Sequence, residues 1–406
     1  MVYTAEQLTH SLNELFELSE KKPKDCLAYE FELWKTHSAD NGVIIYGAGD
    51  MGRVVYAFFQ NMGVSVLAFC DTDKSKWKDG EISILSPEQA SLRFKNALCV
   101  VAINIPQKSN TYFEIAKRMA SAGIKHIVHW DFLRRYQGLT GFNLTENFNI
   151  HSARDVLRNR DQVIAAAYLL SDDYSRELFY KIIRQRFVSD MPVDGWVTVP
   201  GVYFHDDIFR LTADDIIIDG GACDGDTLKA FLDRGGIFKE WHCFEPFDYN
   251  CDAIRTFINT KPEIKNKVFI HKTVLGNSNE DVRFFILNDN IGGGGVIDSH
   301  YKLNSTADGH EVSVSSVRLD DKFELCTFIK MDIEGSEMDA LLGAEKVIRD
   351  NKPILAVSVY HKSTDIWEIP LWIDKIMPDS FFYLRCNQPV YDSVIYAIPK
   401  ERINAR

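Results

Sequence analysis

Two segments in the C-terminal half of the chain carry the residues best suited to chemistry. In FIKMDIEGSE an apolar run reaches Asp332, and in ILAVSVYH another apolar run ends in His361. A carboxylate and an imidazole can orient a hydroxyl group and accept its proton. If the two runs are neighbouring parallel strands, their carboxyl ends meet at one edge of a sheet and bring Asp332 beside His361. We therefore expect a catalytic site at this edge.

The side chains at this edge suggest distinct roles. We expect His361 to be the general base, because the ordinary pKa of histidine, about 6.5, suits proton transfer near neutral pH. Asp332 would orient the imidazole or contact the acceptor. Lys330 shares the face of Asp332 if strand geometry holds, so Lys330 and the nearby Glu334 complete the catalytic candidates.

Other roles for these residues remain open. Glu334 and Glu337 can simply favour the first turn of a helix, where carboxylates are stabilised. A lone histidine at the end of a strand is often structural. Asp332, Glu334 and His361 can also hold a divalent metal that lowers the pKa of an acceptor hydroxyl. We favour a site without a metal.

A glycine-rich turn lies upstream, in DIIIDGGACDGDTLKAF (215–231). Gly221 permits a backbone conformation that a side chain forbids, and Gly225 lets a helix start close to a ligand. Asp219 can accept a hydrogen bond from a ligand ammonium group. Glu245 ends the next predicted strand, 20 residues after Gly225, where a carboxylate can accept both hydroxyls of a ribose. The combination favours an adenosine-containing ligand over a purely structural turn.

A second glycine-rich turn lies near the N-terminus, in VIIYGAGDMGRVVYAF. The spacing of Gly47, Gly49 and Gly52 matches a dinucleotide fingerprint, and Asp71 follows Gly52 by 19 residues, as a ribose-binding acid does. The block after it has room for only one mononucleotide-binding half. It also resembles small Rossmann modules that precede sugar-modifying enzymes and are similar to nucleotide-sugar-binding domains. We expect a nucleotide or nucleotide-sugar site here, with a degenerate scaffold and a working NAD site as alternatives.

The predicted elements divide the chain into four parts. Residues 1–38 form a helical segment that is split at Lys22-Pro23, and 39–138 form a Rossmann-like module. Residues 139–213 form a mainly helical connector, and 214–406 form a second α/β block. Strands that alternate with helix-length segments predict a parallel sheet in each α/β block.

Several elements are expected at defined places. We predict helices at 50–61, 109–123, 161–187, 225–234, 248–259 and 335–349, an extended segment at 196–209, and a closing β-hairpin in FFYLRCNQPVYDSVIYAIP. Four successive glycines lie within 288–304. Because such a run cannot pack a core, we expect a mobile flap over the acceptor site, or else a surface loop.

Five segments of the second block resemble a known family. In order, they are IIIDGGACDGDT, CFEPF, VSSVRLDDKF, FIKMDIEGSEMDALLGA and PILAVSVYH. They resemble the hallmark segments of FkbM-type S-adenosylmethionine-dependent methyltransferases over roughly 200–398, with IKMDIEGSE as the most specific part. The family usually has Asn where this chain has Cys223.

The resemblance implies a fold and an activity. The fold is α/β with two Rossmann-like domains, and the C-terminal one is a class I methyltransferase sheet that ends in an antiparallel hairpin. The activity is transfer of a methyl group from S-adenosylmethionine to a hydroxyl of a carbohydrate, polysaccharide or related secondary metabolite. The cofactor site is expected at Asp219, Gly220, Gly221, Ala222, Asp224, Gly225, Thr227, Glu245 and Pro246.

Two other function classes compete with this interpretation. One is an NAD-dependent sugar oxidoreductase that uses the first turn, although no Tyr-x-x-x-Lys pair in a suitable helix supports it. The other is a non-catalytic nucleotide-binding protein with a relic methyltransferase fold. The intact acids at Asp219, Glu245 and Asp332 argue against a relic.

Composition narrows the possible partners. The chain has 406 residues and a net charge of −12, which disfavours non-specific binding to nucleic acid or anionic membrane. No apolar run approaches the roughly 20 residues that cross a bilayer, and the N-terminus lacks the apolar core of a signal peptide. The eight cysteines form no Cys-x-x-Cys pair, so we expect reduced, buried thiols in a cytoplasmic protein. The expected partner is a small-molecule or saccharide acceptor, and a homo-oligomer is compatible with the sequence.

Overall fold

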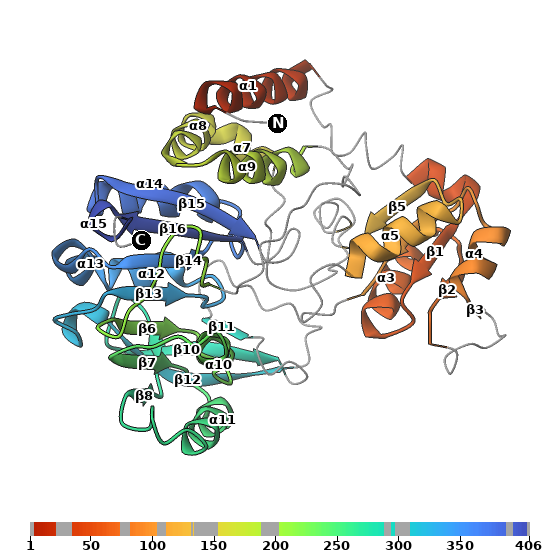
Figure 1. Cartoon of the computed structure of the whole chain (residues 1–406). Coiled ribbons are helices and arrows are strands. Elements are labelled where there is room, and N and C mark those ends of the chain that lie inside the picture. The colour runs from red at the N-terminus through yellow and green to blue at the C-terminus, as the bar shows by residue number, and fades with distance from the viewer. Residues whose placement is uncertain are drawn as a thin grey trace.

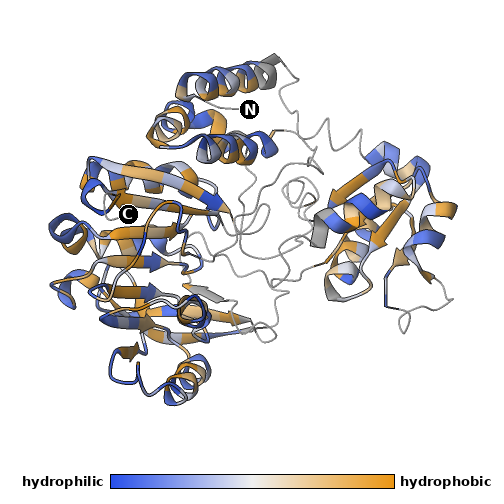
Figure 2. Ribbon diagram, viewed as in Figure 1, coloured by the Kyte–Doolittle hydropathy of each residue, from blue (hydrophilic) through white to orange (hydrophobic). Residues whose placement is uncertain are grey.

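The chain forms two main β-sheets, and in each of them a glycine-rich turn follows the first strand in the sequence (Figure 1). The computed structural model describes residues 4–21, 35–73, 82–103, 111–130, 133, 153–187, 203–287, 294–296, 309–386 and 393–403. In both sheets the strands are mostly hydrophobic, while the helices combine apolar and polar residues (Figure 2). The α/β architecture with two Rossmann-like sheets is confirmed.

The N-terminal sheet has five parallel strands in the order β3-β2-β1-β4-β5. The strands are β1 (Val43–Tyr46), β2 (Val66–Cys70), β3 (Ile84–Leu85), β4 (Leu98–Val101) and β5 (His126–His129). The helices are α3 (Asp50–Asn61), α4 (Pro87–Arg93) and α5 (Thr111–Ser121). The short β3 and α4 were not predicted. Helix α4 starts at a capping box in which Ser86 and Gln89 bind each other's backbone N–H, a signal that the sequence does carry.

The C-terminal sheet has seven strands in the order β15-β16-β14-β13-β6-β7-β8. The strands are β6 (Ile216–Gly220), β7 (Glu240–Phe244), β8 (Val268–His271), β13 (Phe328–Met331), β14 (Ile354–Ser358), β15 (Ser380–Cys386) and β16 (Ser393–Pro399). The five strands from β14 to β8 are parallel, whereas β16 runs antiparallel to both β14 and β15. The predicted antiparallel hairpin at the end of the sheet is confirmed.

Three helices of this block were predicted, one of them with an error, and the structure adds two further helices, α14 (Asp365–Ile376) and α15 (Lys400–Ile403), that were not predicted. The others are α10 (Asp226–Asp233), α11 (Asp248–Asn259), α12 (Glu337–Leu342) and α13 (Glu345–Asn351). The single helix predicted at 335–349 is wrong, because α12 and α13 are separate and meet at Gly343. A Cβ at Gly343 would lie 1.9 Å from the carbonyl oxygen of Gly276, so the chain passes too close to another backbone to carry a side chain there.

A smaller sheet of four strands accompanies the main one. It has the order β11-β10-β12-β9, with β9 (Val274–Leu275), β10 (Asp281–Leu287), β11 (Gly294–Val296) and β12 (Gly309–Val317). Strand β10 pairs antiparallel with both β11 and β12. Within the predicted flap at 288–304, residues 294–296 therefore form a strand, and the rest of that segment lies outside the described residues.

The N-terminal helix and the connector helices pack on the C-terminal block. They are α1 (Ala5–Lys21), α7 (Ala153–Arg158), α8 (Arg160–Leu169) and α9 (Asp173–Gln185). Leu8 and Leu12 of α1 share one hydrophobic cluster with Val163 of α8 and with Trp367 of α14, so segments far apart in sequence form one layer (Figure 1). Of the segment expected to be extended at 196–209, the described part, 203–209, contains no strand. Among the helices that the structure describes, none is both long and apolar enough to span a membrane.

Candidate active site

The turn after β6 requires glycine at Gly221. This residue has a φ of +74°, and a Cβ on it would lie 1.9 Å from the carbonyl oxygen of Asp332. Gly221 and Ala222 both donate their backbone N–H to the carbonyl of Phe244, at 3.1 Å. Gly225 has a φ of +84° and begins helix α10. The turn is thus held between β7 and the segment after β13, at the carboxyl ends of three neighbouring strands.

Glu245 closes the turn from the side of β7. One carboxylate oxygen accepts the backbone N–H of Cys223 at 3.0 Å, and the other accepts the N–H of Phe247 and the side-chain amide of Asn250, both at 3.1 Å. Burial raises the pKa of this carboxyl. Cys223 has a φ of +45°, a region that Asn tolerates better than most residues, which accounts for the Asn usual in the family at this place.

A buried ion pair lies beneath the turn. The Nζ of Lys330 is 3.1 Å from Asp219 Oδ1, and it donates to the carbonyls of Gly220 at 3.1 Å and Gly221 at 2.8 Å. The indole of Trp241 donates to the other Asp219 oxygen at 3.2 Å. Burial alone would lower the pKa of Lys330, but Asp219 and neighbouring carboxylates outweigh burial and raise it, so the ammonium stays charged.

This pair bears on two predicted roles. Lys330, a catalytic candidate, binds the backbone of the glycine turn, and Asp219, expected to face a ligand ammonium, faces Lys330 and Trp241 instead. Both side chains are almost completely buried. In this structure both residues support the turn from below, and a direct role toward a ligand or acceptor stays a prediction for each.

The other predicted cofactor residues surround the same turn. Asp224 pairs with Lys229 at 2.8 Å on the outer side of α10, and Thr227 is buried in the first turn of that helix. Pro246 is half-buried next to Glu245. Their contacts with a cofactor remain predictions.

Asp332 follows β13 and is held by two tyrosines. The hydroxyl of Tyr203 donates to Oδ2 at 2.5 Å, and that of Tyr360 donates to Oδ1 at 2.9 Å. Burial would raise the pKa of Asp332, but His361, Lys330 and the tyrosine hydroxyls outweigh it and lower the pKa. Its side chain nevertheless keeps 26% of its surface exposed.

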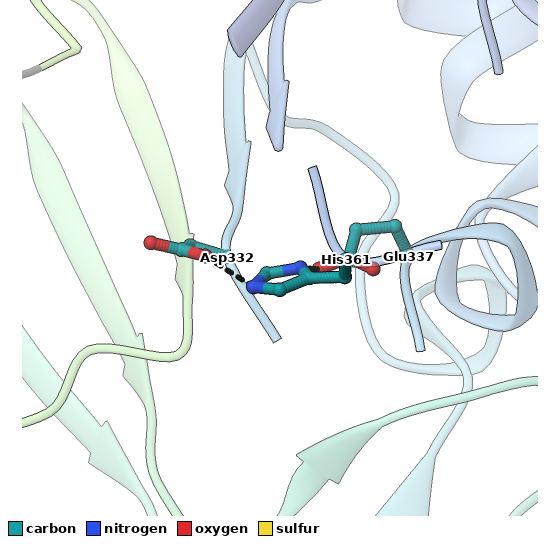
Figure 3. Close-up of side chains that lie close together, drawn as sticks. All are labelled: Asp332, Glu337 and His361. Atoms are coloured by element: carbon teal, nitrogen blue, oxygen red, sulfur yellow. Dashed lines mark hydrogen bonds and ion pairs between the residues drawn. The ribbon is translucent and has the colours of Figure 1, made fainter. Parts of the chain in front are cut away.

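His361 lies between carboxylates on both sides of its ring (Figure 3). Its Nδ1 is 2.7 Å from Glu337 Oε1, and its Nε2 is 3.4 Å from Asp332 Oδ1 and 3.9 Å from Glu334 Oε2. Strands β13 and β14 are paired, so Asp332 and His361 lie side by side, as the predicted order of strands requires. Burial would lower the pKa of His361, but Glu337, Glu334 and Asp332 outweigh it and raise the pKa to about 10.

The first glycine turn has a related geometry and a different surrounding. Gly47 has a φ of +111°, and a Cβ on it would lie 2.5 Å from the carbonyl oxygen of Ala102. Asp71 accepts the N–H of Ala48 at 3.0 Å. A Cβ on Gly49, in contrast, would have no other atom within 4 Å, so the turn is open at this point. The structure therefore brings the acid against the turn and leaves room above Gly49.

Comparisons with known proteins match the two α/β blocks to two different domain families. Residues 219–385 match the family described as methyltransferase FkbM domain. The C-terminal block contains a methyltransferase FkbM domain. Residues 42–114 match the PglD N-terminal domain. This match identifies the domain family of the N-terminal block, and it does not specify the nucleotide-sugar binding that the sequence suggested.

One solved structure shares the fold across both blocks. The crystal structure of methyltransferase FkbM from Methylobacillus flagellatus KT is 21% identical and has a TM-score of 0.68, covering 97% of this chain and 100% of that one. An rRNA methylase from Streptococcus thermophilus, 10% identical over 48% of this chain and 91% of that one, has a TM-score of 0.30. No curated protein matches the chain.

A metal in the methyltransferase domain would have to compete with the imidazole. One ligand atom each from Asp332, Glu337 and His361 lie within 4.8 Å of one another, so Glu337 takes the place that the sequence gave to Glu334. However, the ring lies between the two carboxylates and turns a different nitrogen to each (Figure 3). A cation shared by both carboxylates would displace the ring, so the arrangement suits an ion-paired imidazolium better than a metal.

Sequence reasoning did not find the two tyrosines of the methyltransferase domain. Tyr360 immediately precedes His361, two residues after the end of β14, so its place next to the histidine was a usable signal. Tyr203 comes from the connector and reaches Asp332 across a separation of 129 residues, with a φ of +60° and with its ring 5.1 Å from Lys330 Nζ. No local pattern marks such a residue.

Proposed function

We propose that the chain is an S-adenosylmethionine-dependent O-methyltransferase whose acceptor is a hydroxyl of a carbohydrate, polysaccharide or related secondary metabolite. The observation that carries this proposal is the continuity of the glycine turn with the acidic edge. Gly221 packs on the backbone of Asp332, and Cys223 donates to Glu245. A ligand on the turn would thus lie between the ribose-binding acid and the group next to the acceptor.

The residues around the turn fit this cofactor. Glu245 provides carboxylate oxygens at the place where ribose hydroxyls are bound in related folds. The carboxylates of Asp332 and Glu334 favour a ligand with a positive charge near the edge of the sheet. When bound, the cofactor would supply an electrophilic methyl group on a positively charged sulfur. The chain itself has to align the acceptor and take its proton, and alignment alone is worth several kcal/mol, roughly 7–11 at its upper limit.

The proposed acceptor class follows from the groups that remain accessible. Asp332 and Glu334 have side-chain exposures of 26% and 32%, whereas His361 and Glu337 are 1% exposed. Ionised carboxylates only accept hydrogen bonds, and hydroxyl groups of a polyol are suitable donors. A saccharide-like acceptor therefore fits the open part of the site.

Titration calorimetry with S-adenosylmethionine tests the cofactor. Glu245→Ala should bind it more weakly than the unmodified chain, because the ribose loses its acceptor and the Cys223 N–H of the turn loses its partner. Glu263→Ala is the matched control, since Glu263 is an exposed acid outside the turn. Undiminished affinity in Glu245→Ala would remove Glu245 from the site, and no binding by the unmodified chain would refute the cofactor.

We also propose that the N-terminal module binds a nucleotide or nucleotide sugar. The support is the open space above Gly49 next to the Asp71 carboxylate. A nucleotide should raise the unfolding temperature of the chain independently of S-adenosylmethionine. A screen that includes NAD separates this proposal from the oxidoreductase alternative, and a screen without any shift favours a scaffold.

A cytoplasmic location is part of the proposal. In the described part of the chain, all cysteines but Cys223 are buried. Reduced, buried thiols are usual in the cytoplasm.

A further inference from the structure

The proton acceptor has to touch the acceptor substrate, and the geometry makes this difficult for His361. Its side chain is 1% exposed, and carboxylate oxygens face both ring nitrogens, at 2.7 Å and 3.4 Å. Neither nitrogen therefore offers a lone pair to an incoming hydroxyl. Asp332 is the member of the pair that reaches the open side of the site, with 26% of its side chain exposed.

The hydrogen bonds of Asp332 leave room for one more donor. Oδ1 faces both Tyr360 and His361, whereas Oδ2 accepts only from Tyr203 among the contacts of the described residues. A carboxylate oxygen has two lone pairs, so Oδ2 can accept one further hydrogen bond. An acceptor hydroxyl bound there has its proton directed at a carboxylate that is already fixed by three side chains.

Glu337 is built to hold His361 and has no access to the substrate. It is 1% exposed, and its Oε1 faces His361 Nδ1 at 2.7 Å while accepting the backbone N–H of Ile333 at 2.9 Å. The second bond ties the carboxylate to the same segment that carries Asp332. Glu337 therefore fixes the distance between the imidazole and Asp332 as well as the orientation of the ring.

We propose that Asp332 accepts the hydroxyl proton and that Glu337 is a positioning residue that keeps His361 as a charged donor toward Asp332. This inference rests on the proposed methyl transfer. The acceptor oxygen bonds to the methyl carbon, the carbon–sulfur bond breaks with its electron pair left on sulfur, and the hydroxyl proton passes to Asp332 Oδ2. A weakly basic carboxylate suffices, because the oxygen becomes strongly acidic as it gains the methyl group. The protonated His361 and the two tyrosines keep the Asp332 carboxylate in place, and the contact with His361 is weakened when His361 loses its proton.

Carboxyl groups approach His361 from three elements, and Lys362 is the cation next to it in the chain. Glu337 approaches from α12, Glu334 and Asp332 from the segment after β13, and Asp365 from α14. Glu334 has a φ of +56°, a conformation that is costly for a side chain and that directs this carboxylate toward the imidazole. Burial and Glu337 raise the pKa of Asp365 to about 7, so this fourth carboxyl takes up a proton near neutrality.

The test compares pH–rate profiles of the unmodified chain and Glu337→Gln, a substitution that keeps an oxygen for the Ile333 N–H. In the unmodified chain activity should fall as the pH rises toward about 10, where His361 loses its proton. In Glu337→Gln the pKa of His361 should drop by roughly 1–3 units, so the alkaline fall moves to lower pH and activity at pH 8–9 decreases. If His361 were the base, the same change would free more neutral imidazole and raise the activity there, which would overturn the proposal.

Two further measurements keep the outcome interpretable. Histidine-selective NMR, with the signal assigned through His361→Asn, reports the pKa of His361 without turnover, and an unchanged pKa in Glu337→Gln would exclude the positioning role. S-adenosylmethionine affinity should be equal in Glu337→Gln and in the exposed control Glu324→Gln, so a failure of the proposed cofactor is seen separately. If Glu337→Gln does not fold, Glu334→Gln removes the charge 3.9 Å from Nε2, and the same downward shift is expected, while an unshifted profile counts against the proposal.

Discussion

The two glycine turns of this chain have the same backbone plan and different chemistry. Gly47 donates its N–H to Cys70, the last residue of β2, at 2.7 Å, and Gly221 donates to Phe244, the last residue of β7, at 3.1 Å. Both glycines have positive φ. A Cβ on Gly47 would clash with the carbonyl oxygen of Ala102, the first residue after β4, and a Cβ on Gly221 would clash with that of Asp332, the first residue after β13. The two turns are thus equivalent positions of two Rossmann-like sheets.

An acid lies against each turn in the same way. Asp71 accepts the N–H of Ala48, and Glu245 accepts that of Cys223, both at 3.0 Å. This shared contact shows that an acid at the end of the second strand already stabilises the turn without a ligand. The acid alone therefore does not identify a binding site, and the surrounding side chains must decide.

Those surroundings differ at three equivalent positions. Where β6 and β13 pair Asp219 with Lys330, β1 and β4 pair Ile45 with Val100. Where Asp332 follows β13, Ala102 follows β4, and each donates its N–H back to the central strand. The first turn has an apolar pair beneath it and Ala102 next to it, whereas the second has a buried ion pair beneath it and Asp332 next to it. The comparison suggests ligand binding alone at the first turn and chemistry at the second.

The largest expected effect is a loss of methyl-transfer activity on substitution of Asp332, whose equivalent in the first sheet is Ala102. Asp332→Asn should lower the methyl-transfer rate by roughly 10²–10⁴-fold, because the hydroxyl loses its proton acceptor. Affinity for S-adenosylmethionine should fall much less than the rate, since the residue contacts the turn through its backbone and its carboxylate adds only an attraction to the positive charge of the ligand. Steady-state kinetics and calorimetry measure both, and a rate within threefold of the unmodified chain would place the chemistry elsewhere.

The second prediction concerns substitutions that break the buried ion pair of Asp219 and Lys330. Lys330→Val alone leaves Asp219 buried without a cation and should reduce the free energy of unfolding by about 3–5 kcal/mol. The double change Asp219→Ile with Lys330→Val copies the apolar pair of the first sheet and should recover a large part of that loss. Chemical denaturation measures this, and equal instability of the single and double variants would show that the ion pair itself is required.

The third prediction compares the glycines. Gly221→Ala should destabilise the chain by about 1–3 kcal/mol, because its backbone is left-handed and a Cβ would meet Asp332. Gly49→Ala should alter the unfolding free energy by less than about 0.5 kcal/mol, since its Cβ enters open space. If Gly49→Ala weakens nucleotide binding without a change in stability, the first turn is a binding site, and unchanged binding favours a scaffold.

The last prediction concerns the pH dependence of stability. The pKa of His361 is raised from its usual 6.5 to about 10 in the folded chain. A raised pKa means that the stabilisation is fully present below about 6.5 and is lost as the pH rises to about 10. The difference in unfolding free energy between the unmodified chain and His361→Asn should therefore shrink over this interval. A difference that stays constant over this interval would show that His361 is neutral in the folded state.

The sequence by itself determined the α/β fold, the two glycine turns, the acids that follow the strands and the closing hairpin, because periodicity, glycine spacing and strand-end acids are local patterns. It also placed Asp332 beside His361, since the ends of adjacent parallel strands must meet. Only the tertiary structure decided which groups these side chains face. Tyr203 arrives from a distant connector, Lys330 turns to the glycine turn, and Glu337 lies behind His361. Burial and charge pairing depend on neighbours that are remote in the chain, and for this reason the protonation state of the imidazole was beyond the reach of the sequence.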